Sequence, residues 1–125
     1  MNSSRHIFDH GRLAYLQIPA LDVNVSAAFY QANFHWQIRG QGTEHLGFSD
    51  ASGDTIGAWV TGRAISASPG VLAYIYVHGI DAALAQITAS GGDIVTEPYA
   101  EGDLWVARFR DPAGNVLGIW QQAPR

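Results

Sequence analysis

The sequence predicts an α+β fold built from two copies of a βαβββ module. Two pairs of similar segments indicate this duplication. Residues 14–22 resemble residues 73–81 at an offset of 59, and residues 48–59 resemble residues 109–120 at an offset of 61. A third observation is the order of patterns: in each half a strand-like segment precedes a helix-like apolar spacing, and shorter strand-like segments follow it. Each half is too short to bury a large core alone, so the 125-residue chain is expected to be one domain with a shared core.

The first module is expected to begin with a strand at residues 13–19, where apolar side chains alternate with others. Asp22 stands where a helix N-cap belongs, and apolar residues follow it at helical spacing. Asn33 is expected to end this helix in a left-handed conformation. Three shorter strands are then predicted at residues 34–39, 44–49 and 55–61.

The second module repeats this order. A strand is predicted at residues 71–77, Asp81 is expected to cap the helix, and Gly91 and Gly92 are expected to end it. The remaining strands are predicted at residues 93–96, 104–110 and 115–121.

Turns and connections set the expected boundaries. Asp50 to Gly53 and Asp111 to Gly114 each place Asp first and Gly fourth, which is typical of a type I turn. Residues 63–69 are predicted to link a module at about residues 12–62 to one at about residues 70–123. Residues 1–11 are expected to form an N-terminal arm ahead of the single domain at residues 12–123.

Composition excludes several classes of function. The net charge is −4, and the seven basic residues, all of them Arg, are not clustered, so no nucleic-acid partner is expected. The absence of Cys excludes disulfides and thiolate sites, and the absence of Lys excludes a lysine Schiff base. No long apolar run predicts a membrane span, and the first residues carry no secretory signal, so a cytoplasmic protein is expected.

Two motifs carry a resemblance to a known family. Leu-Gln-Ile-Pro-Ala-Leu-Asp at residues 16–22 precedes a helix containing Ala-Phe-Tyr, and Phe-Arg-Asp-Pro-Ala-Gly-Asn-Val-Leu-Gly-Ile-Trp occupies residues 109–120. The paired modules and these motifs resemble the vicinal-oxygen-chelate superfamily, which includes glyoxalase I, bleomycin-resistance proteins and extradiol dioxygenases. The resemblance implies one eight-stranded cup-shaped sheet with helices outside, a site inside the cup, and a homodimer.

The same resemblance locates four metal-ligand positions, one on the first and one on the last strand of each module. In this sequence they are Tyr15, Gly57, Tyr74 and Gly118. Glycine has no ligating side chain, and neutral tyrosine is a poor ligand for divalent first-row metals. The chain therefore departs from the metal-using members at all four positions, and neither a metal site nor another cofactor is expected.

Strand alternation predicts what lines the cup instead. The side chains expected to face inward are Tyr15, Gln17, Thr55, Gly57, Trp59, Tyr74, Tyr76, Val116, Gly118 and Trp120. Aromatic rings and an amide around paired glycines predict a slot for a flat, mainly apolar molecule. The alternative is an ordinary core in which these side chains fill the space themselves.

Three functions are consistent with these patterns. The first is metal-independent binding of a small aromatic or hydrophobic molecule, similar to the bleomycin-resistance branch. The second is an enzyme, either a glyoxalase-like lyase or isomerase or one with a non-standard or metal-free site, and the third is a structural protein with a solid cup. No catalytic residue is assigned. Strand alternation does not determine whether four titratable side chains reach the site: His45, His78, Glu101 and Arg108.

Overall fold

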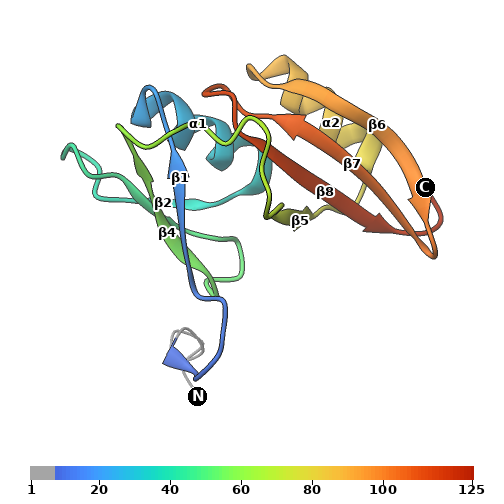
Figure 1. Cartoon of the computed structure of the whole chain (residues 1–125), viewed down its shortest axis with the longest axis horizontal. Coiled ribbons are helices and arrows are strands. Elements are labelled where there is room, and N and C mark those ends of the chain that lie inside the picture. Colours follow the sequence, from blue (N-terminus) through green and yellow to red (C-terminus); the bar gives the residue numbers. More distant parts are fainter. Residues whose placement is uncertain (1–7) are drawn as a thin grey trace. The chain divides into compact units, whose positions relative to one another are not determined.

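The computed structural model describes residues 8–125, which form two helices and eight strands (Figure 1). The first module contains β1 (Tyr15–Pro19), α1 (Val23–Phe34), β2 (Gln37–Arg39), β3 (Gly47–Ser49) and β4 (Ile56–Val60). The second contains β5 (Tyr74–Tyr76), α2 (Ile80–Ala89), β6 (Asp93–Glu101), β7 (Leu104–Arg110) and β8 (Val116–Gln122). The predicted α+β class and the two βαβββ modules are confirmed.

Each module forms its own four-stranded mixed sheet. The strand orders are β1-β4-β3-β2 and β5-β8-β7-β6, so the last strand of each module pairs in parallel with the first. The other pairs are antiparallel. Hydrogen bonding thus distributes the eight strands over two sheets, one per module.

The chain divides into two compact units between Ala64 and Ile65, inside the predicted linker. The second half of that linker is tied to the second module, since the Ser66 amide donates to Asn115 Oδ1 at 2.9 Å. Of the expected arm, residues 1–7 lie outside the described residues, and residues 8–11 form a turn before β1. That both modules belong to one domain stays a prediction.

The core of the first module is a stack of aromatic rings between α1 and its sheet. Tyr30 of α1 is fully buried and stacks on Trp36 at a centroid distance of 4.8 Å. Trp36 stacks on Phe48 of β3 at 4.5 Å, and Phe48 contacts Trp59 of β4 at 4.9 Å. These large rings bury much apolar area in a module with few strand residues.

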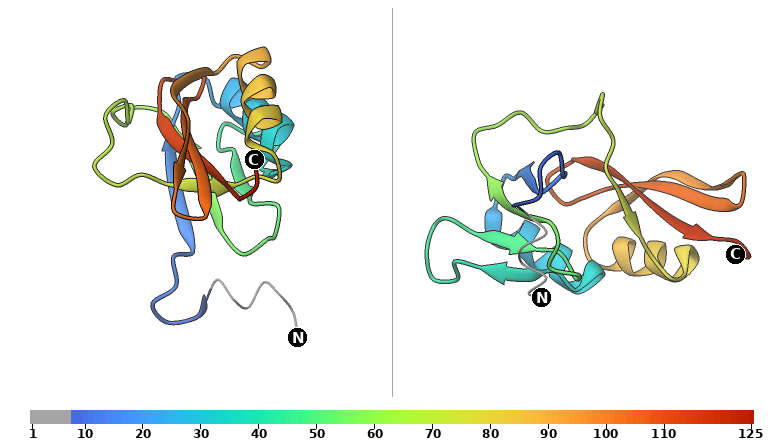
Figure 2. Two further views of the ribbon diagram at one scale, coloured as in Figure 1. Left: turned by 90° about the vertical axis from the view of Figure 1, so that its right-hand side faces the viewer. Right: turned by 90° about the horizontal axis from the view of Figure 1, so that it is seen from below.

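The core of the second module is mainly aliphatic. Ile80 and Ile87 of α2 are fully buried, as are Phe109 of β7 and Ile119 of β8. Figure 2 shows α2 running along one face of the sheet formed by β6, β7 and β8. Gln121 Oε1 accepts a hydrogen bond of 2.7 Å from the Ile80 amide, so the start of α2 is fixed to β8.

Two expected helix ends are confirmed and two are wrong. Gly91 and Gly92 follow the last residues of α2, with Gly91 at φ 106° and the Gly92 amide donating to the Ile87 carbonyl. Asp22 caps α1 and accepts from the amides of the next turn. Asn33 does not end this helix, because α1 continues to Phe34 and His35 takes the left-handed conformation at φ 60°. Asp81 is not the cap of α2, since Gly79 occupies that position and Asp81 lies in the first turn.

The predicted turns are confirmed, but their lengths differ. Asp50 and Asp111 each accept backbone amide hydrogen bonds through Oδ1. The loop of the first module closes where the Asp50 amide donates to the Thr55 carbonyl, five residues on. In the second module the Asp111 amide donates to the Asn115 carbonyl, four residues on. The first loop is therefore one residue longer, which changes the register of β4.

Candidate ligand-binding faces

The face of the second sheet that α2 leaves open carries several rows of side chains, of which two contain the predicted site residues. Gln121 contacts α2, so odd-numbered residues of β8 point to the helix and even-numbered ones to the opposite face. The strand register places residues of the four strands side by side on this open face. One row is Tyr74, Gly118, Arg108 and Thr96, and the next is Tyr76, Trp120, Val106 and Tyr99. Four of the predicted site residues therefore share this face: Tyr74, Tyr76, Gly118 and Trp120.

Gly118 allows the ring of Tyr74 to lie on the sheet. A Cβ atom at position 118 would collide with three ring carbons of Tyr74. Because the glycine leaves this space, the phenol reaches across β8, and Arg108 Nε lies 3.4 Å from Tyr74 Oη. That distance is long for an N–H···O bond, which is usually about 2.7–3.2 Å.

Tyr99 joins this polar pair from the edge strand. The hydrogen bond that Arg108 donates to Tyr74 raises the pKa of the guanidinium, and Tyr99 adds to this effect. Burial raises the pKa of the Tyr99 phenol, and the neighbouring Tyr74 acts in the same direction. The Tyr99 phenol is therefore neutral near pH 7, while Arg108 is positively charged.

The neighbouring row is aromatic and accessible. Tyr74 and Tyr76 are 38% and 44% exposed, although their rings are apolar. Tyr76 meets Trp120 edge to face, with centroids 4.8 Å apart at 72°. The His78 ring also meets Tyr76 edge to face, with centroids 5.7 Å apart. Exposed rings in fixed mutual geometry offer surfaces on which a planar molecule can stack.

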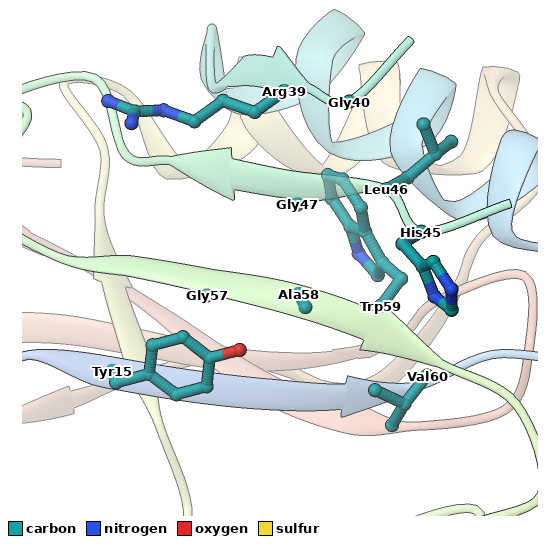
Figure 3. Close-up of a pocket in the computed structure, with 10 residues that line it drawn as sticks. All are labelled: Tyr15, Arg39, Gly40, His45, Leu46, Gly47, Gly57, Ala58, Trp59 and Val60. Atoms are coloured by element: carbon teal, nitrogen blue, oxygen red, sulfur yellow. The ribbon is translucent and has the colours of Figure 1, made fainter. Parts of the chain in front are cut away.

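The open face of the first sheet contains Tyr15 and Gln17. Tyr15 is 53% exposed, and Gln17 Oε1 accepts from Arg63 at 2.9 Å. An open hollow of about 400 Å³ lies here. Figure 3 shows two of its lining residues, Tyr15 on β1 and Ala58 on β4. Its remaining lining residues are Arg39, Gly40, His45, Leu46, Gly47, Gly57, Trp59 and Val60.

Gly57 and Trp59 line this hollow but do not share a sheet face with Tyr15. β1 pairs with β4 so that Leu16 lies opposite Gly57 and Ile18 opposite Trp59. Trp59 is 2% exposed and contacts Tyr30 of α1, with centroids 6.0 Å apart. The expectation that Gly57 and Trp59 share a face with Tyr15 is wrong, because the longer loop shifts β4 by one residue and such a shift reverses every side chain.

The four family-type ligand positions do not fit a shared metal. Tyr15 and Gly57 point to opposite faces of their sheet. A side chain at Gly57 would collide with the Leu16 carbonyl and the Phe48 ring, and one at Gly118 with the Tyr74 ring. Within residues 8–125, no three His, Asp or Glu side chains are grouped in a way that could hold a metal ion. We therefore derive no metal-dependent step.

The structure also brings in residues that the sequence left open or missed. Arg108 belongs to the open face of the second sheet, whereas exposed Glu101 lies two rows away, opposite Leu104. His45 lines the hollow of the first module. Tyr99 was missed because β6 was predicted to end at residue 96. The strand continues past two register shifts, and its continuation carries Glu97, Pro98 and Ala100, residue types depleted in strands, so local propensity favours an earlier end.

The family profile of the Glyoxalase/Bleomycin resistance protein/Dioxygenase superfamily matches residues 12–119. The chain belongs to this superfamily. The match spans both modules, so the resemblance indicated by the two motifs is confirmed. No curated protein matches the sequence.

Solved structures share the fold at low sequence identity. A glyoxalase/bleomycin resistance protein/dioxygenase family enzyme from Burkholderia phytofirmans is 20% identical with a TM-score of 0.73, covering 90% of this chain and 100% of that one. An antibiotic binding protein from a Streptomyces species is 22% identical with a TM-score of 0.68, covering 90% and 97%. The genomically encoded fosfomycin resistance protein of Listeria monocytogenes is 15% identical with a TM-score of 0.74, covering 92% and 96%. At these identities the likeness shows the fold alone.

No helix among the described residues is long and apolar enough to cross a membrane.

Proposed function

We propose that the chain binds a small, flat, mainly apolar molecule, without a metal, on the sheet faces that its helices leave open. The observation that carries this proposal is the exposed aromatic row of the second module. Tyr76 is 44% exposed, and its ring is held at 72° to that of half-buried Trp120. Exposed rings in a defined arrangement stabilise a stacked ligand while losing little side-chain entropy.

The remaining lining residues support the same proposal. Tyr74, Gly118, Tyr15 and Gln17 occupy open faces, so we retain them as ligand-lining residues with Tyr76 and Trp120. Gly57 and Trp59 turn toward α1 in their strand register but also line the hollow of the first module, so we retain them as ligand-lining residues there. The antibiotic binding protein with this fold supports the same class of activity.

Titration of intrinsic tryptophan fluorescence with planar compounds tests the proposal. Trp120 is expected to report binding, so Trp120→Phe should abolish most of the signal change. Trp105→Phe is the matched control, since Trp105 pairs with Gln121 on the α2 side of the sheet and should leave the response intact. Absence of any response across the panel, with calorimetry also silent, would overturn the proposal.

Two further measurements address metal and turnover. Elemental analysis of protein purified without chelators should find no stoichiometric divalent ion. Chromatography of the bound compound after incubation should recover it unchanged. A stoichiometric metal, or a product that forms with the protein and not without it, would favour the alternative of an enzyme. The homodimer is likewise a proposal, and sedimentation should give twice the mass of 13.5 kDa.

A further inference from the structure

The open face of the second sheet carries a positive charge without a carboxylate partner. Arg108 is half-buried on β7, and none of the carboxylates of residues 8–125 forms an ion pair with it. Arg125, by comparison, has a carboxylate partner, because Asp81 lies 2.9 Å from its Nη2. An arginine that lies among aromatic side chains and lacks a carboxylate partner can bind an anionic ligand.

Two phenols fix the guanidinium without neutralising it. Tyr74 Oη lies 3.4 Å from Arg108 Nε, and Tyr99 adds to the raised pKa of Arg108. A guanidinium has five N–H donors in a planar fork, so most of them stay available. The phenols thus orient the fork while the charge remains free for a ligand.

The charge lies next to the aromatic row. Arg108 is opposite Gly118 on β8, and Trp120 is two residues further along that strand. Such diagonal neighbours are about 7–8 Å apart, which is a span that an aromatic ring and its acid group can cover. Glu101 lies two rows from Arg108 on the far side of Tyr99. The row on the other side of Arg108 pairs Arg110 with Asp93, so those two charges offset each other, and Arg108 remains the unpaired cation of this face among residues 8–125.

From this arrangement we infer that the face selects planar aromatic carboxylic acids, with the ring on Tyr76 and Trp120 and the carboxylate on Arg108. The inference rests on the proposed function and names its ligand class. A carboxylate matches the guanidinium fork with two parallel hydrogen bonds, whereas a neutral amide offers one acceptor oxygen and no charge. A cationic ligand of the same shape is repelled by Arg108.

Calorimetric titration with naphthoate, naphthamide and naphthylmethylammonium provides the test, since the three share one ring system. Naphthoate is expected to bind about tenfold more tightly than naphthamide, and the cation more weakly than both. The preference for naphthoate over naphthamide should shrink as sodium chloride is added, because salt screens a half-exposed charge pair.

Three variants assign the preference to this site. Arg108→Gln should remove the preference for naphthoate, because it lowers the affinity for naphthoate about tenfold and leaves the affinity for naphthamide unchanged. Arg125→Gln removes the same charge from the α2 side of the module and should leave the preference intact. Gly118→Ala should displace the Tyr74 ring from Arg108 and reduce the preference, and circular dichroism should show that this variant stays folded.

The outcomes separate the inference from the function on which it rests. Equal affinity for naphthoate and naphthamide, or an Arg108→Gln variant that keeps the preference, would overturn the selection of acids and leave aromatic binding standing. Failure of all three probes and of the wider panel would overturn the proposed function itself.

Discussion

Trp59 and Trp120 occupy equivalent positions in the sequence repeat but different environments. Trp59 is 2% exposed within the ring stack of the first module, whereas Trp120 is half-buried beside Tyr76 on an open face. Identical residues at repeated positions therefore do not indicate identical roles. One supports the core, and the other is available to a ligand.

Substitution by alanine should separate these roles. Trp59→Ala removes a ring that contacts Tyr30 and Phe48, so it should lower the free energy of unfolding by about 3–5 kcal/mol. Trp120→Ala should cost only about 1 kcal/mol, because the lost contact is chiefly the ring pair with Tyr76. Urea unfolding measures both. Equal losses of stability would contradict the assignment of Trp59 to the core.

The turn aspartates form a second pair of repeat equivalents. Asp111 is 2% exposed, and its Oδ1 accepts from the amides of residues 113, 114 and 115, while its Oδ2 accepts from the Asn115 side chain. Asp50 makes a similar set of amide bonds but is half-buried, so water can replace its carboxylate.

Asp111→Ala should therefore destabilise the protein more than Asp50→Ala. Removing Asp111 leaves buried donors without an acceptor, and we expect a loss of about 3 kcal/mol. Asp50→Ala should cost about 1 kcal/mol, because its amides can turn to solvent. Differential scanning calorimetry measures the two melting temperatures, and a larger decrease for Asp50→Ala would show that burial does not determine the cost.

At the scale of elements, the sequence predicts where the strands lie better than which side of the sheet each side chain faces. Alternation correctly placed Tyr74, Tyr76 and Trp120 on one face. The same rule failed for Trp59, because the first loop closes at Thr55 and shifts β4 by one residue. Period-two patterns state which residues share a face, but register depends on how a turn closes in three dimensions.

The residue types on each helix help to predict which side chains of the sheet face that helix. α1 presents buried Phe29, Tyr30 and Phe34, whereas the buried side chains of α2 are aliphatic: Ile80, Leu84 and Ile87. Aromatic side chains on a helix pack well against rings on the facing strand, which favours Trp59 pointing toward α1. Only the packed structure shows that this preference determined the register.

The C-terminal residue interacts with α2 through an ion pair that titrates. Arg125 hydrogen-bonds to both carboxylate oxygens of Asp81, at 3.0 and 2.9 Å, and lies 4.9 Å from the centre of the Trp105 ring. The hydrogen bond from Arg125 lowers the pKa of Asp81 below its ordinary 3.8.

This pair predicts a specific acid dependence. Because the folded pKa of Asp81 is depressed, its stabilising effect is complete above the unfolded value and is lost as the pH falls through the folded pKa. Arg125→Gln should return the Asp81 pKa toward 3.8, as measured by NMR titration of its carboxyl carbon. Arg108→Gln is the control and should leave that titration unchanged, since Arg108 interacts with Tyr74 and Tyr99 instead.

At the scale of the whole molecule, the repeat and the two motifs were sufficient to predict the family and the pair of βαβββ modules. They could not determine which face of each sheet is available, because the repeat assumes equal register in both halves. Of the polar part of the candidate site, Arg108 was left open and Tyr99 was missed. Tyr99 lies on β6, whose pairing with β7 includes register shifts, so sequence spacing alone does not bring it to Tyr74.

Size predicts that the two modules unfold together. Each is about half of the chain, and a domain of about 60 residues buries only about 60% of its unfolded surface, which leaves it marginal alone. Trp59→Ala should therefore lower hydrogen-exchange protection of the slowest amides in β7 and β8 as well as in its own module. Phe109→Ala, in the core of the second module, should likewise lower the hydrogen-exchange protection of amides in β4. Loss of protection confined to the substituted module would show two independently stable units, and the shared-domain prediction would then be wrong.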